Sequence, residues 1–102
     1  MDHCEHCEDI AHKHTPRSPE LTADLTRRLN RVIGQLGGVK TMLEDNRYCG
    51  DVLTQLAAAQ SALRGISEIV LKDHLETCVV ERIGEGDSEV LDEFMRLVRK
   101  FS

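Results

Sequence analysis

Apolar side chains recur at intervals of three and four residues through the first half of the chain. The stripe consists of Leu21, Leu25, Leu29, Val32, Leu36, Val39 and Leu43. This spacing predicts an amphipathic helix. Ser18, Pro19 and Glu20 offer an N-cap, a proline at the first helical position and an acid in the first turn. Turn-forming Asp45 and Asn46 predict the end of this helix.

A second, longer stripe runs from about residue 48 to residue 83. It passes through Val52, Leu56, Ala59, Leu63, Ile66, Val70 and Leu75. Gly84 and Gly86 predict the end of this helix, and Asp87 or Ser88 offers a cap for the next element. A short third helix follows, with Val90, Leu91, Phe94, Leu97, Val98 and Phe101 on its apolar side.

The composition supports an all-α fold with three helices per protomer. The 102 residues include no Trp, one Tyr and two Phe, and the long stretches are rich in residues that favour helices. A chain of this length leaves much of the second apolar stripe exposed unless another copy covers it. We therefore expect dimerisation through the first two helices into an antiparallel four-helix bundle.

Residues 1–17 read as a polar, flexible tail, and residues 18–102 as the helical domain. The tail places His3, Cys4, His6 and Cys7 within five residues, a set that offers metal donors but that also fits a solvated polar tail. No strand pattern follows the Cys-x-x-Cys pair, so a thioredoxin-type enzyme is disfavoured and we expect no enzymatic activity.

The chain contains no hydrophobic signal segment and no apolar run long enough to span a membrane. Its four cysteines are therefore interpreted as reduced thiols of a cytoplasmic protein rather than as a secreted disulfide framework. The net charge of −5 argues against a uniformly basic nucleic-acid binder, although a local basic face remains compatible with it.

Cys49, His74 and Cys78 are the strongest candidates for chemistry. Three residues separate His74 from Cys78, so these two side chains share a helical face. Cys49 lies 25 residues before His74, or roughly 37 Å along a straight helix. In an antiparallel pair of helices, however, Cys49 of one copy lies beside the other copy's His74 and Cys78. The spacing therefore predicts an intersubunit metal site.

Two thiols and an imidazole favour soft or borderline metal ions: Cu(I), Zn(II) or, with a further donor, Ni(II). Three donors without an obvious fourth favour trigonal Cu(I). The alternative is that the two cysteines are small buried residues and His74 is a hydrogen-bonded core histidine. The joint spacing favours the metal site.

The first predicted helix also carries a cationic strip composed of Arg27, Arg28, Arg31 and Lys40. Such a strip can contact DNA phosphates, but taken alone it also fits a solvated helix face. Symmetry in an oligomer would repeat the strip across a wide surface. No helix-turn-helix or zinc-finger signature accompanies it.

Over residues 20–101 the sequence resembles the copper-sensitive operon repressors, the CsoR branch of the CsoR/RcnR family. The resemblance rests on Arg28-Leu29, Gly34-Gln35, Tyr48-Cys49, Asp51-Val52, Ala59-Gln60 and His74-Leu75-Glu76-Thr77-Cys78. It implies a dimer-of-dimers homotetramer. The apo form of such a protein binds operator DNA and represses copper-efflux genes, and Cu(I) releases it. A copper chaperone is an expected donor of the ion.

The resemblance also implies roles for particular residues. Cys49 of one protomer, with His74 and Cys78 of the partner subunit, would bind the metal. Tyr48 and Glu93 match positions beside the family's ligands. Arg28 matches the DNA-contacting arginine, with Arg31 and Lys40 as further candidates.

Some positions depart from the family pattern. Gly37 stands where many relatives carry a basic residue, and Arg17 stands about where the nickel and cobalt branch has a histidine. Two alternatives stay open. One is a Ni(II)-responsive repressor with a tail residue as the fourth ligand. The other is a metal-storage protein or metallochaperone centred on Cys4 and Cys7.

Overall fold

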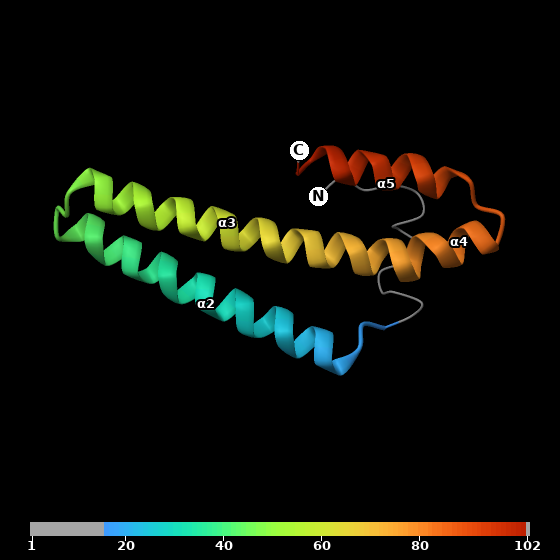
Figure 1. Cartoon of the computed structure of the whole chain (residues 1–102), viewed down its shortest axis with the longest axis horizontal. Helices are drawn as coiled ribbons and strands as arrows, with labels where there is room; N and C mark the ends of the chain where they lie inside the picture. The colour runs from blue at the N-terminus through green and yellow to red at the C-terminus, as the bar shows by residue number, and fades with distance from the viewer. Residues whose placement is uncertain (1–15, 102) are drawn as a thin grey trace. The chain divides into compact units, whose positions relative to one another are not determined.

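The computed structural model describes residues 16–101, and every regular element in that range is helical (Figure 1). The elements are α2 (Pro19–Glu44), α3 (Cys49–His74), the π-helix η1 (Leu75–Val79), α4 (Val80–Gly84) and α5 (Glu89–Arg99). The all-α prediction is confirmed. None of the described helices is long and apolar enough to cross a membrane.

The helical hairpin, residues 19–70, forms one compact unit. Its two helices run antiparallel (Figure 1). The buried residues recur at every seventh position along each helix: Leu25, Val32 and Val39 on α2, and Val52, Ala59 and Ile66 on α3. Gln35 Nε2 also donates to Gln55 Oε1 across the helices at 3.4 Å. A seven-residue repeat keeps one stripe of each helix against its neighbour.

The turn between α2 and α3 confirms the predicted helix end. Asn46 has φ 55°, a left-handed conformation that asparagine tolerates better than most residues. The Arg47 N–H donates to Met42 O at 2.9 Å, and the Asn46 N–H donates to Leu43 O at 3.2 Å. This is a Schellman motif, which satisfies carbonyl groups left unbonded at the helix end.

The C-terminal unit comprises, among the described residues, 16–18 and 71–101. Val79 of η1 and Val90 of α5 are fully buried and form its centre. Gly86 has φ 88° and makes a second Schellman motif after α4, as the sequence predicts. The Glu89 N–H donates to Asp87 Oδ1 at 3.1 Å, so Asp87, rather than Ser88, caps α5.

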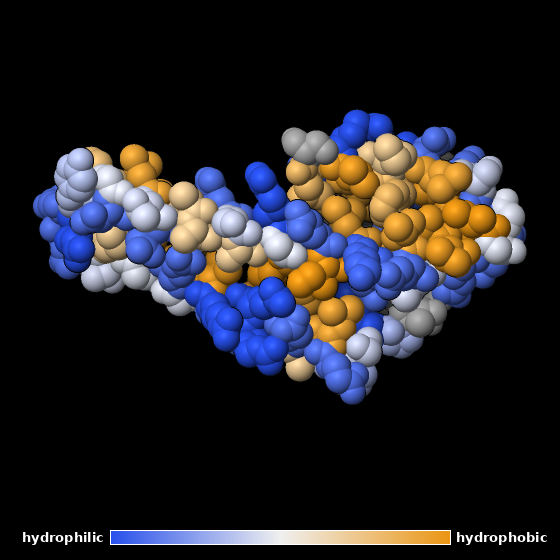
Figure 2. Space-filling view, viewed as in Figure 1, coloured by the Kyte–Doolittle hydropathy of each residue, from blue (hydrophilic) through white to orange (hydrophobic). Residues whose placement is uncertain are grey.

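The surface of the C-terminal unit keeps large apolar side chains, which Figure 2 shows gathered over α4 and α5. The exposed residues are Leu75, Val80, Ile83, Leu91, Met95 and Phe101. Because exposed patches of this kind mark interaction surfaces, this face is suited to contact with another protein surface.

The prediction of one uninterrupted α-helix over residues 48–83 is wrong in one segment. Residues 75–79 form a π-helix, in which the Val80 N–H reaches back five residues to Leu75 O. The Thr77 hydroxyl donates to Asp73 O at 2.7 Å. That carbonyl oxygen would accept the Thr77 N–H in a regular α-helix, so the side chain competes with the backbone ladder. Segments of π-helix inside α-helices occur frequently at functional sites.

Candidate metal centre and nucleic-acid face

Cys49 and His74 are the first and last residues of α3. Helical rise separates them by roughly 37 Å. Cys49 is exposed and carries a free thiol. Within residues 16–101 no three His, Cys, Asp or Glu side chains of one chain converge in a geometry suited to a metal ion. This arrangement is compatible with the expectation that Cys49 meets the other two donors only across protomers.

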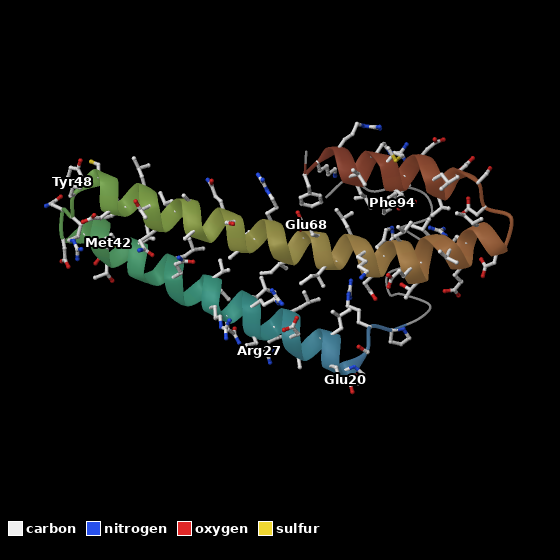
Figure 3. All side chains as sticks on the ribbon, in the orientation of Figure 1. Glu20, Arg27, Met42, Tyr48, Glu68 and Phe94 are labelled. Carbon is white, nitrogen blue, oxygen red and sulfur yellow. The ribbon has the colours of Figure 1, made fainter. Side chains whose placement is uncertain are left out.

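His74 and Cys78 both belong to the C-terminal unit and are both partly buried. The His74 ring stacks on Phe94 of α5, with ring centroids 6.2 Å apart and planes inclined by 20°. The His74 Nε2 atom is buried. Figure 3 labels Phe94 on α5. The stack limits the orientations open to the imidazole, as expected for offset ring pairs at this separation.

Thr77 lies between the two donors in sequence. Its hydroxyl contacts Asp73 O at 2.7 Å and Cys78 Sγ at 3.6 Å. Because a hydroxyl has one hydrogen and the shorter bond is to the carbonyl oxygen, the Thr77 oxygen is a polar neighbour of the Cys78 sulfur.

Glu93 lies on α5 and its side chain is 15% exposed. Its carboxylate oxygen Oε2 lies 3.8 Å from Arg82 Nη1, and Arg82 Nε lies 3.4 Å from Asp87 Oδ2. Glu93 therefore belongs to a small, mostly buried ionic group in the same unit as His74 and Cys78. Removing one member of such a group leaves an uncompensated charge, which makes it sensitive to local rearrangement.

Tyr48 lies at the turn that joins α2 and α3 and is 75% exposed (Figure 3). Its ring covers Gly50, because a Cβ built at Gly50 would collide with the ring and would lie only 3.1 Å from Cδ2. Glycine at position 50 therefore permits the aromatic ring to lie over the first turn of α3, next to Cys49.

The cationic strip of α2 is exposed, and part of it is already paired. Asp24 Oδ1 accepts from Arg27 Nη2 at 2.6 Å, and Asp24 Oδ2 accepts from Arg28 Nε at 2.9 Å. The hydrogen bond from Arg28, with its positive charge, lowers the pKa of Asp24 below its usual range. Arg31 and Lys40 are also exposed, and within residues 16–101 they make no ion pair.

Sequence reasoning missed Asp24, Thr77, Arg82 and Phe94 as neighbours of the candidate residues. The spacing of Asp24 to the two arginines, three and four residues, could have revealed that pair. The other three depend on the π-helix and on how α5 packs, which no local spacing predicts. The accessory donors His3, Cys4, His6 and Cys7 lie outside the described residues, as does most of the predicted tail.

Comparisons with known proteins bear on the identity of the chain. The family described as metal-sensitive transcriptional repressor matches residues 22–100. The copper-sensing transcriptional repressor CsoR of Bacillus subtilis (strain 168) is 38% identical over 79 residues, which are 76% of this chain and 78% of that protein.

Two solved structures are also similar. The copper-sensing repressor CsoR with Cu(I) from Geobacillus thermodenitrificans NG80-2 has a TM-score of 0.81 and 41% identity, over 87% of this chain and 94% of that one. The nickel-responsive transcriptional regulator InrS has a TM-score of 0.67 and 36% identity, over 89% and 100%. The chain therefore belongs to the family of metal-sensitive transcriptional repressors, a class of regulators that bind operator DNA.

Proposed function

We propose that this protein is a Cu(I)-responsive transcriptional repressor whose apo form binds its operator and whose Cu(I)-bound form leaves it. One observation carries the proposal: Cys49 lies at one end of α3, and His74 and Cys78 lie at and just beyond the other end. An antiparallel pair of such helices would bring Cys49 to His74 and Cys78 of the partner subunit, twice per dimer.

The chemistry of these donors fits Cu(I). Two thiols and one imidazole form a soft set, and soft donors favour Cu(I) over harder ions. Cys49 is exposed and accessible to a partner, whereas His74 is held by Phe94. When bound, Cu(I) would supply a covalent link between α3 of one protomer and η1 of the other.

Exposed leucines support the proposed dimer. Leu29, Leu36 and Leu43 also repeat every seven residues along α2, but they are 41%, 43% and 61% exposed. They form a second row, offset by four residues from the buried row. A second hairpin packed on this row would give a four-helix bundle. We propose that two such dimers form the homotetramer.

The response of DNA binding to metal requires two packings of the subunits with unequal affinity for the operator. We propose that fixing His74 rearranges the neighbouring Phe94 and the Arg82–Glu93 pair, and that α3 carries the change toward the hairpin. Typical allosteric coupling amounts to about 1–3 kcal/mol.

On the DNA side, Arg28 is the first candidate for phosphate contact, with Arg31 and Lys40 as further contacts. All three are exposed on α2. Tyr48 and Glu93 are proposed as residues that support the metal donors. A repressor of transcription acts on chromosomal DNA, which is consistent with the proposed cytoplasmic location.

The decisive experiment is an anaerobic titration of the reduced, metal-free protein with Cu(I) and, separately, with Ni(II). Anisotropy of a labelled fragment from its own promoter region reports DNA binding. Release at one Cu(I) per protomer, with Ni(II) inert, is the expected result. DNA binding indifferent to both ions would overturn the proposal.

The similarity to the nickel-responsive InrS favours one alternative: a Ni(II)-responsive repressor with a tail residue as the fourth ligand. Release by Ni(II) alone, with a nickel-thiolate absorption band, would establish it. Deleting residues 1–17 tests the tail. Under the Cu(I) proposal the deletion barely changes metal affinity, whereas under the nickel or the metal-storage interpretation it removes tight binding.

A further inference from the structure

The carboxylate of Asp24 contacts two arginines of the cationic strip, each through a different nitrogen of its guanidinium group. It contacts Arg27 through Nη2, at 2.6 Å, and Arg28 through Nε, at 2.9 Å. The Asp24 side chain is 30% exposed, while those of Arg27 and Arg28 are 60% and 47% exposed. Both arginines thus remain accessible to a ligand of α2 while sharing one anion; Figure 3 labels Arg27.

The atoms used by Asp24 give the two arginines different capacities. A guanidinium has five N–H donors in a fixed plane. A contact at Nε leaves both Nη groups of Arg28 able to grip a phosphate with two parallel hydrogen bonds. On Arg27 the contact with Asp24 is at Nη2, so one of its two Nη groups is already occupied. The shared anion also reduces the local charge of the pair from two to one.

We propose that Asp24 is a positioning residue that determines DNA specificity: it orients Arg28 for the operator backbone and weakens the attraction of the strip for other DNA. This inference rests on the proposed DNA-contacting role of Arg28. Binding of non-operator DNA depends mainly on charge, whereas operator binding also depends on fixed geometry. The single carboxylate of Asp24 therefore weakens non-operator binding and supports operator binding.

The ionisation of Asp24 supports this role. The hydrogen bond from Arg28 lowers the Asp24 pKa, so the carboxylate stays charged near neutral pH. The hydrogen bonds lie within one helix, three and four residues apart, and therefore depend only on α2. They form in each protomer without help from a partner.

The test compares apo wild-type protein with Asp24→Asn, which keeps the shape and removes the charge. Affinities for the operator and for a scrambled duplex of equal length are measured over a series of salt concentrations. We expect the operator-to-scrambled affinity ratio to fall by about threefold or more, since the freed charge strengthens non-operator binding. The salt slope for scrambled DNA should steepen by about 0.9 for each protomer in contact.

Three further variants separate positioning from charge alone. Glu20→Gln removes the same charge from α2, and Glu20 makes no ion pair within residues 16–101, so it should leave the ratio unchanged. Asp24→Glu should restore much of the ratio. In an Arg28→Ala background, Asp24→Asn should cause no further loss of operator affinity. Circular dichroism and gel filtration confirm that each variant folds and assembles.

An unchanged ratio in Asp24→Asn, or an equal fall in Glu20→Gln, would overturn the inference. Either result leaves the proposed function intact, because release of the wild-type protein by Cu(I) is measured separately. If wild-type protein binds the operator but ignores Cu(I), the proposed function fails, while the affinity ratio still decides the role of Asp24.

Discussion

The hairpin and the C-terminal unit are built on different principles. The hairpin consists of α2 and the part of α3 up to Val70, and its buried positions repeat every seven residues. The C-terminal unit uses elements of 5, 5 and 11 residues around two fully buried valines. The first is regular and repetitive, and the second depends on individual contacts such as the His74–Phe94 stack.

This difference matches the two tasks of a metal-responsive repressor. The regular hairpin carries the exposed arginines and the exposed thiol of Cys49, the groups for which we propose partners outside the protomer. The irregular unit holds His74 and Cys78 partly buried, and it also contains the π-helix and the ionic group of Arg82, Asp87 and Glu93. We infer that the C-terminal unit supplies two of the three proposed metal donors, and that the hairpin supplies the third donor and the proposed DNA contacts.

The largest effect is expected from Cys49→Ala. Apo DNA binding should stay intact, because Cys49 is an uncharged residue of α3 whereas the cationic strip lies on α2, but Cu(I) should no longer release the DNA. Anisotropy of the labelled operator during a Cu(I) titration measures this. Persistent release would remove Cys49 from the ligand set.

A mixture of Cys49→Ala and Cys78→Ala protomers sharpens the same point. Each variant alone lacks both sites of its dimer. A mixed dimer retains one complete site, formed by Cys49 of one protomer and His74 and Cys78 of the partner subunit. Tight binding of one Cu(I) per mixed dimer is expected. Binding no tighter than in either variant alone would exclude an intersubunit site.

Arg28→Ala is expected to weaken operator binding by about tenfold or more, since charge-assisted hydrogen bonds contribute about 1.5–3 kcal/mol. The salt slope should fall by about 0.9 for each Arg28 in contact with a phosphate. Cu(I) stoichiometry should stay near one per protomer. Arg64→Ala, at an exposed arginine of α3, is the matched control and should change affinity less.

Two cavity-forming substitutions, one in each unit, test whether the two units have separate cores. Val90→Ala in the C-terminal unit and Val39→Ala in the hairpin should each lower the free energy of unfolding by about 1.5–3 kcal/mol. Val90→Ala should weaken the Cu(I) response more than apo DNA binding, and Val39→Ala should do the reverse. Thermal melts and operator titrations measure both. Equal effects of the two variants on both functions would contradict the division.

Much of the hairpin could be predicted from the sequence because its signals, Pro19 at the start of α2 and the turn at Asn46, act within a few residues of themselves. The turn at Gly86, in the C-terminal unit, was predicted from the same kind of local signal. The π-helix could not be predicted, because the bond from the Thr77 hydroxyl to the carbonyl four residues back also forms at Thr41 and Thr54 inside regular α-helices. For the site, the positions of Cys49 and His74 on α3 followed from spacing, whereas the Phe94 stack and the Arg82–Glu93 pair follow from tertiary packing.

A smaller effect is expected from Phe94→Leu, which keeps an apolar side chain of similar size but removes the ring stacked on His74. Aromatic pairs contribute about 0.5–1.5 kcal/mol beyond buried area, so Cu(I) affinity should fall by about two- to tenfold. Competition with a chelator of known Cu(I) affinity measures this. Phe101→Leu, at an exposed position of the same unit, is the control. A change of equal size in both variants would mean that the stack does not position His74.

The smallest effect is expected from Gly50→Ala, because the collision it creates is with the end of a side chain that can rotate away. The Tyr48 ring should leave the first turn of α3, while the backbone and the DNA-binding surface stay unchanged. Tyr48 is the sole tyrosine and the chain has no tryptophan, so its fluorescence reports this movement directly. If the ring supports Cys49, the Cu(I) affinity of the variant should fall slightly, by less than in Phe94→Leu. A shifted fluorescence signal with unchanged Cu(I) affinity would show that the ring rests beside the metal donor without acting on it, and would restrict the metal-sensing contacts to the C-terminal unit and Cys49 itself.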